Sequence, residues 1–270
     1  MKTKLARRSM IELLALILPV LFNVNIFAQS SPPPPRIAEV RLIKVEPQNA
    51  AEFEKQVKDV WKPVNQARKQ SGRTAGWQFY KVNFAGTADA YNYAAVIFYD
   101  DWKKTEPNEN MIDAIKAALP KADAAAIAAK AGSLAKIVQN ALYSQVDGVG
   151  KPDTRVKYIM INFMKVKDGM GDAYVASETK DWKPIHKEMA DAGKRAGWGL
   201  WSLAYPGGTS NTHDYVTTDT YESYTQMFES MRDAFKKVYP NDEMTPFFQK
   251  TEKTRTIVRQ ELWELLEIVN

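Results

Sequence analysis

The 270-residue sequence contains no cysteine and only two histidines. Without cysteine the chain forms no disulfide, thiolate zinc site, iron–sulfur cluster, cysteine nucleophile or lipid anchor on an N-terminal cysteine. Two histidines are too few for an all-histidine metal site. The sequence also lacks phosphate-binding and dinucleotide-binding glycine motifs and a nucleophile elbow. What it has is 45% hydrophobic and 26% charged residues, the balance of a globular protein with a buried core.

The N-terminus has the layout of a secretory signal peptide. Four basic residues precede an apolar run over 11–22, and Ala28 stands just before a polar, proline-rich stretch. The run is shorter than the roughly 20 residues that a membrane span needs, and an uncleaved anchor is the alternative. We predict a signal peptide over residues 1–28, an extended spacer over 29–35, and a periplasmic or extracellular mature protein.

The net charge gives no reason to expect nucleic-acid binding. The chain has 37 basic and 32 acidic residues, a net charge of +5. Cleavage after Ala28 removes four basic residues and Glu12, which leaves 33 basic and 31 acidic residues and a net charge of +2. No basic stripe remains, so we expect neither a nucleic-acid partner nor a stable membrane span after cleavage.

The rest of the chain contains two similar copies of one sequence unit. Trp-Lys-Pro-Val at 61–64 recurs as Trp-Lys-Pro-Ile at 182–185, and Ala-Gly-Trp at 75–77 recurs at 196–198, both at an offset of 121 residues. Similarity at a fixed offset indicates a structural repeat. One inserted residue raises the offset to 122 in the third predicted strand of each copy.

Each copy predicts the element order βαββαβ of a ferredoxin-like module. Apolar and β-branched runs predict strands over 37–45, 77–82, 93–99 and 140–146, and over 156–166, 198–203, 215–221 and 261–268. Pro63 and Pro184 fall inside the first helix of each copy, where we predict a kink or break. The second helical region is interrupted at Pro120 or Pro240.

A single module of this kind leaves one apolar sheet face uncovered, and two modules can cover each other. We therefore predict an α+β fold in which two ferredoxin-like modules pack as a pseudo-dimeric α/β-barrel within one chain. The modules cover 36–147 and 155–270, and a glycine-rich linker covers 148–154. Further oligomerisation is left open.

Two motifs resemble those of the dimeric α/β-barrel superfamily, which includes antibiotic-biosynthesis monooxygenases and haem-degrading monooxygenases. Ala196-Gly197-Trp198 enters the second strand, and Tyr221-Glu222-Ser223-Tyr224 ends the third strand and opens a helix. The resemblance covers 36–269 as a tandem pair. It implies a cavity for a small, largely apolar or aromatic molecule, which we place in the second module.

The haem-degrading members of this superfamily use an Asn on strand one, a Trp that opens the second helix and a His within that helix. Asn162 matches the first position, but Tyr224 replaces the Trp and no His occurs over 225–239. The first copy has Trp102 but carries Arg41 in place of the Asn, and it also lacks the His. We therefore predict no cofactor, and keep haem binding, with His186 as an axial ligand, as an alternative.

Comparison of the copies identifies candidate catalytic residues. Val57, Asn65 and Ile97 of the first copy align with three polar residues in the second: Glu178, His186 and Asp219. Glu178 and His186 share one helix face with Trp182, because each follows the previous one by four positions. If that face lines a cavity, these residues handle protons; otherwise they face solvent.

Six further residues are candidate ligand contacts: Asn162, Trp182, Trp198, Trp201, Tyr215 and Thr217. For the aromatic residues the alternative is ordinary core packing. His213 lies in a loop rich in Gly, Ser, Asn and Thr, and we expect it to be exposed.

The sequence thus predicts an exported protein that binds a small apolar or aromatic molecule. Whether it is an enzyme stays open. One reading is a cofactor-independent monooxygenase-like enzyme, in which His186 or Asp219 removes a proton before oxygen attack. The alternatives are a non-catalytic binding or structural module of the cell envelope, and a haem-binding protein.

Overall fold

The computed structural model describes residues 36–150 and 156–270. The predicted signal peptide, the proline-rich spacer and residues 151–154 of the predicted linker lie outside the described residues. Among the described helices, none combines the length and the apolar character that a bilayer span requires.

Both halves of the chain have the predicted order βαββαβ. The first module contains β1 (Ile37–Val45), α1 (Ala50–Gln56), α2 (Lys62–Gln70), β2 (Gly76–Asn83), β3 (Tyr93–Tyr99), α3 (Met111–Ala118), α4 (Ala124–Leu134) and β4 (Ala135–Gly150). The second contains β5 (Tyr158–Val166), α5 (Gly171–Ala176), α6 (Lys183–Asp191), β6 (Gly197–Tyr205), β7 (Tyr215–Tyr221), α7 (Arg232–Val238), α8 (Met244–Glu252) and β8 (Arg255–Val269). The breaks between α3 and α4 and between α7 and α8 fall at Pro120 and Pro240, as predicted.

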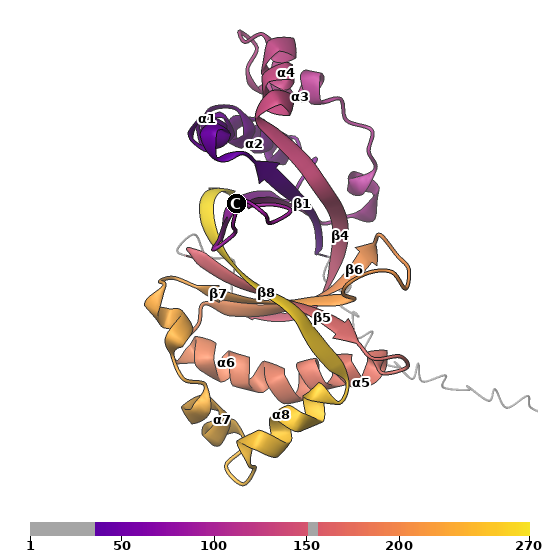
Figure 1. Ribbon diagram of the computed structural model, residues 1–270, viewed down its shortest axis with the longest axis vertical. Coiled ribbons are helices and arrows are strands. Elements are labelled where there is room, and N and C mark those ends of the chain that lie inside the picture. The colour runs from indigo at the N-terminus through magenta and orange to yellow at the C-terminus, as the bar shows by residue number, and fades with distance from the viewer. Residues whose placement is uncertain (1–35, 151–155) are drawn as a thin grey trace, which may run out of the picture. The chain divides into compact units, whose positions relative to one another are not determined.

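The strands form one closed antiparallel barrel in the order β1-β3-β2-β8-β5-β7-β6-β4 (Figure 1). The two modules join along two seams, because the last strand of each module has two partners. β4 pairs with β1 through its first part and with β6 over 142–150, and β8 pairs with β5 and, over 262–269, with β2. The predicted pseudo-dimeric α/β-barrel is confirmed.

Alternation along the strands gives the barrel an inner and an outer apolar face. The inner faces of both modules build one shared core, which includes Tyr80, Ala94, Tyr143, Phe163 and Trp263. The outer face of each module packs against that module's own helices, which lie outside the barrel (Figure 1). Each module therefore has a helix–sheet interface of its own, and the barrel interior belongs to both.

The predicted irregularity at the two prolines is present as a wide helical turn. A π-helical turn, Val57–Trp61, joins α1 to α2, and another, Ser177–Trp182, joins α5 to α6. Each proline then lies in the first turn of the following α-helix, where a missing backbone N–H is tolerated. The chain thus continues as a helix through the site of the expected break.

The last strands are longer than predicted, and part of the predicted linker is strand. Residues 148–150 belong to β4 and pair with β6. Gly150 has φ of 92°, and a Cβ there would lie 2.6 Å from the carbonyl oxygen of Ala196. The glycines that suggested a linker are required because the two strands approach closely at this seam.

Candidate functional site

The polar residues singled out in the second copy gather in its helix–sheet interface. Glu178 lies on the π-helical turn, His186 on α6, Asn162 on β5 and Asp219 on β7, and each is at most 7% exposed. Thr217 of β7 is buried beside Asn162. We call these residues, together with Tyr174, Arg195 and Arg255, the polar cluster. Their burial decides against the solvent-exposed alternative for Glu178 and His186.

Arg195, which the sequence comparison missed, is the central cation of the polar cluster. Its Nη1 donates to Asp219 Oδ1 at 2.6 Å and also to His186 Nδ1. Its Nη2 lies 3.4 Å from the Tyr221 hydroxyl, and its guanidinium lies 5.6 Å from the centre of that ring. Since a guanidinium only donates, Nδ1 of His186 must accept, and the imidazole proton is placed on Nε2.

His186 is held in its neutral form. Burial, and then the charge of Arg195, lower the pKa of His186 well below its ordinary value. Its ring stacks on Trp198 at 5.0 Å with an interplanar angle of 9°. The position therefore suits a fixed hydrogen-bond donor at Nε2 better than a base at Nδ1.

Asp219 and Asn162 are fixed by several partners. The Asn162 amide nitrogen donates to Thr217 at 3.1 Å and to Asp219 at 3.3 Å, while its oxygen accepts from Gln260 at 2.6 Å. Burial raises the pKa of Asp219, and the charge of Arg195 opposes that shift. The ion pair with Arg195 keeps this carboxylate occupied, which makes it a poor free base.

Glu178 is the group in the polar cluster best placed to exchange a proton. Burial raises the pKa of Glu178 to about 7, against the opposing effects of Arg255 and of the Tyr174 hydroxyl. The side chain is only 3% exposed. Near neutral pH both protonation states are populated, as general acid–base catalysis requires.

Three hydrogen-bond donors of the polar cluster are buried without a partner. They are the Tyr174 hydroxyl, Arg195 Nε and Arg255 Nε, among seven such side-chain atoms in the described part of the chain. The Tyr174 hydroxyl interacts with Glu178, but its geometry falls short of a full hydrogen bond. A buried polar atom without a partner costs about 1–3 kcal/mol, so these groups need an explanation.

The aromatic candidates divide between two places. Trp182 donates from Nε1 to Thr251 at 2.7 Å and packs on Phe247 and Phe248, and Tyr215 packs on Tyr174. With Trp198 they line the helix–sheet interface. Trp201 does not, because it faces the shared barrel core. Its placement in the site was wrong.

His213 is buried rather than exposed, so that expectation was also wrong. The residue is 5% exposed, its Nε2 lies 2.8 Å from the Tyr143 hydroxyl, and its ring packs edge-on against Phe163 at 4.9 Å. It aligns with Tyr91 of the first module, which is also a buried aromatic residue of the barrel core. That alignment was the available signal.

The first module has apolar residues at four of the corresponding positions. Phe53, Val57, Ala95 and Ile97 align with Tyr174, Glu178, Thr217 and Asp219, and all eight residues are buried. The four from the first module belong to one apolar cluster. The fold therefore does not itself require polar groups at these positions.

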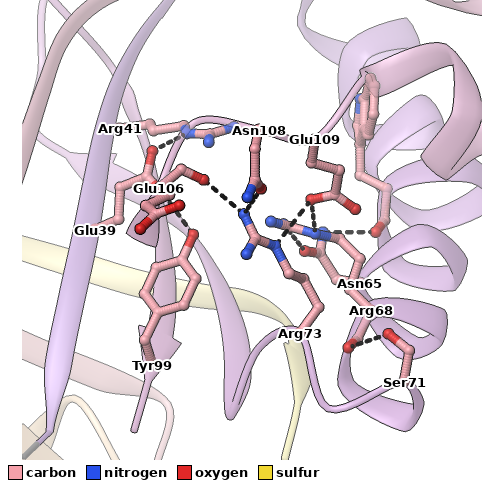
Figure 2. A network of polar contacts seen from close by, with 11 residues as sticks. Glu39, Arg41, Asn65, Arg68, Ser71, Arg73, Tyr99, Glu106, Asn108 and Glu109 are labelled. Atoms are coloured by element: carbon pink, nitrogen blue, oxygen red, sulfur yellow. Dashed lines mark hydrogen bonds and ion pairs between the residues drawn. The ribbon is translucent and has the colours of Figure 1, made fainter. Parts of the chain in front are cut away.

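The polar contacts of the first module include Arg41 and Asn65, which align with Asn162 and His186 (Figure 2). Glu39 accepts from Arg41, Tyr99 and Asn140 at 2.7, 2.8 and 2.9 Å. Nearby, Arg68 pairs with Glu109 at 2.9 Å, and Arg73 holds the loop at Glu106 and Asn108 (Figure 2). The first set links β1 to β3 and β4, and the second links the loop before α3 to α2 and the turn after it, which is a structural role.

Neither module presents the haem-degrading pattern. Asn162 has its amide engaged by Asp219, Thr217 and Gln260, while Tyr224 and Trp102 are 42% and 41% exposed at the surface. Within the described ranges, no group of three His, Asp or Glu side chains is placed to hold a metal ion.

No family model and no curated protein matches this sequence. Among solved structures, a protein of Fusobacterium nucleatum described as a proposed monooxygenase aligns at 12% identity and a TM-score of 0.55, over 87% of this chain and 94% of its own. An anthrone oxidase-like protein aligns at 8% identity and a TM-score of 0.49, over 87% and 93%. A haem-binding protein of Thermus thermophilus aligns at 7% identity and a TM-score of 0.47, over 87% and 95%. The first alignment shows that this chain shares the α+β barrel fold of the dimeric α/β-barrel proteins.

Proposed function

We propose that the protein is an exported small-molecule-binding protein whose ligand site is the polar cluster of the second module. The observation that carries the proposal is the contrast between the modules. Burying polar groups without full hydrogen bonding is unfavourable, and the first module has apolar residues at the positions that align with Tyr174, Glu178, Thr217 and Asp219. A ligand that completes the polar contacts explains why the second module retains them.

The free donors indicate the class of ligand. The three unpartnered atoms, the Tyr174 hydroxyl and the Nε atoms of Arg195 and Arg255, all donate hydrogen bonds. Their ligand therefore carries oxygen acceptors, such as carbonyl or carboxylate groups. The rings of Trp182 and Trp198 both stack on His186 in the same cluster, and such flat surroundings favour an aromatic or otherwise flat apolar ligand body.

If the site is catalytic, Glu178 is the proposed base. Its pKa of about 7 suits proton transfer near neutral pH, whereas Arg195 occupies both Asp219 and Nδ1 of His186. In that reading Glu178 removes a proton from an activated ring, the step before oxygen attack in the chemistry that the fold resemblance implies. His186 then donates from Nε2 and positions the ligand.

The test is mass spectrometry of small molecules retained by the natively purified protein, with a visible absorption scan. We expect an oxygen-containing aromatic molecule in the wild type and its loss in the variant Tyr174→Phe/Glu178→Val, which installs the residues of the first module. Tyr93→Phe, which removes a hydroxyl from the first module, is the matched control and should retain the molecule.

Two outcomes contradict the proposal. An empty wild type, with the double variant less stable than wild type, would assign the polar cluster a structural role. A Soret band lost on mutation of His186 would instead identify a haem protein.

A further inference from the structure

A pocket of about 270 Å³ lies where the end of β2 meets the middle of β8. Its lining includes Val82, Phe84, Asp89, Arg259 and Glu261. Neighbouring β8 residues face opposite sides of the sheet, so Gln260 contacts Asn162 of the polar cluster while Glu261 contacts residues of the barrel interior. Gln260 also lines the pocket, so the pocket adjoins the polar cluster through this residue, but none of the unpartnered donors of the proposed ligand site lines it.

Glu261 places a buried carboxylate at this pocket. The residue is 7% exposed and accepts from the Tyr91 hydroxyl at 2.5 Å and from Trp263 Nε1 at 2.7 Å. Its third partner is Arg259 Nε. The tyrosine and tryptophan are core residues and stay in place, whereas the Arg259 side chain is 45% exposed and can move into solvent.

Arg259 shows what kind of group fits beside Glu261. Its guanidinium pairs with Glu261 and lies 5.2 Å from the centre of the Tyr91 ring. A carboxylate together with an aromatic face is a common recognition element for organic cations. Asp89, 3.9 Å from the Arg259 Nη2, offers the displaced guanidinium a second carboxylate.

The rim of the pocket carries backbone strain. Phe84 has φ of 63°, a left-handed conformation that is unfavourable for a bulky residue, and it is 84% exposed. The following turn is held by Asp89, whose Oδ2 accepts from the Gly86 amide at 2.6 Å. Strained residues of this kind occur at ligand-binding loops, and here the strain presents an aromatic ring at the pocket rim.

The equivalent position at the other seam between the modules lacks this arrangement. In the last strand of each copy the offset is 120 residues, because Ile137-Val138 aligns with Ile257-Val258 and Leu142 with Leu262. Ala141 therefore aligns with Glu261 and Gln139 with Arg259, while Asn211 aligns with Asp89 at the offset of 122. The barrel therefore closes without an acid, and without an acid–arginine pair, at the equivalent position.

We propose that this pocket binds a small organic cation, a primary ammonium or guanidinium compound, which replaces Arg259 on Glu261. A volume of about 270 Å³ limits the ligand to a small molecule. Glu261 then pairs with the ligand, and Asp89 pairs with the displaced guanidinium of Arg259.

The test is isothermal titration calorimetry with n-butylammonium and methylguanidinium as probes and butyrate as the anionic control. Arg259→Ser removes the competing cation and should tighten cation binding by about tenfold. That change corresponds to about 1.4 kcal/mol of binding free energy. Adding Glu261→Gln should abolish binding. Gln139→Ser, the aligned surface change, should leave the wild-type affinity unaltered.

Because Glu261→Gln removes a buried charge that holds two core residues, it can prevent folding. Asp89→Asn keeps the proposal testable, because Asp89 lies at the surface: in the wild-type background it should weaken cation binding by removing the alternative partner of Arg259. Equal cation affinity in wild type and Arg259→Ser, preferential binding of butyrate, or no binding by any folded variant would overturn the proposal.

Discussion

At the residue scale, Glu178 is a carboxylic acid at a buried position where the fold does not require a polar side chain. The aligned residue in the first module is Val57, and both side chains are buried against the sheet. A carboxyl group at a position where valine suffices carries a desolvation penalty, which appears as the raised pKa of Glu178.

The pKa shift predicts a pH-dependent stability. The ordinary pKa of 4.5 rises to about 7 on folding, so the folded state binds the proton more tightly. The associated stability is fully present below about pH 4.5 and is lost as the pH rises through 7. A shift of this size corresponds to roughly 3 kcal/mol. Relative to Glu178→Gln, the wild type should therefore lose about 3 kcal/mol of unfolding free energy between about pH 4 and pH 8.

Urea denaturation of both proteins at the two pH values measures this difference. The comparison with Glu178→Gln removes most of the contribution of other titrating groups, including Asp219. A difference between the two proteins that does not change with pH would contradict the buried, proton-binding state of Glu178.

The sequence located part of this site because the two copies act as internal controls. Glu178 and Asp219 could be found because the residues that align with them in the first copy are apolar. Arg195 could not, because its aligned residue, Thr74, is also polar and its pairing with Asp219 joins a loop to a distant strand. Trp201 was misplaced although strand alternation puts it on the face opposite Trp198, three residues earlier.

At the element scale, β4 and β8 each have a stretch with a single partner strand. Residues 135–141 pair with β1, and 255–261 pair with β5, while β6 and β2 begin to pair only beyond these stretches within the described residues. The free edges expose Ile137 and Val138, and Ile257 and Val258. Open edges with β-branched side chains favour aggregation.

We therefore expect the double variant Val138→Lys/Val258→Lys to aggregate more slowly than wild type on mild heating, followed by light scattering. Both side chains are exposed, so the free energy of unfolding should change by no more than about 0.5 kcal/mol. Val138→Ile/Val258→Ile is the apolar control and should aggregate as the wild type does. Equal aggregation rates for the lysine and isoleucine variants would show that these edges do not drive association.

The same stretches explain the errors in the predicted strand ends. Residues 136–140 and 256–260 are exposed, so their sequence lacks the alternation that marks a half-buried strand. The irregularities of the helices were easier to predict from the sequence, because proline marks both the internal breaks and the wide turns. The π-helical geometry itself was not foreseen, since the sequence pattern indicated only that a regular helix could not pass Pro63 or Pro184.

At the scale of the whole molecule, the shared barrel core makes the modules depend on each other. The inner cluster takes residues from both modules, such as Tyr80 and Tyr143 from the first and Phe163 and Trp263 from the second. Separating the modules would expose this core to water and open two strand seams. The fold class could be predicted because each module alone leaves one apolar sheet face uncovered.

We therefore expect a single cooperative unfolding transition for residues 36–270, with equal calorimetric and van't Hoff enthalpies. A cavity-forming substitution in the first module's part of the core, Tyr80→Ala, should lower the melting temperature of the whole protein and accelerate hydrogen exchange in both modules. Two resolved calorimetric peaks, or exchange accelerated in the first module alone, would show that the modules unfold independently.

The two halves of a barrel made from one polypeptide can differ in sequence, unlike those of a barrel made from two identical polypeptides. In the latter, every amino-acid replacement appears twice, and a destabilising acid would have to be tolerated on both sides. Here the first half has apolar residues at the positions that align with Tyr174, Glu178, Thr217 and Asp219, so only the second half carries that energetically unfavourable constellation.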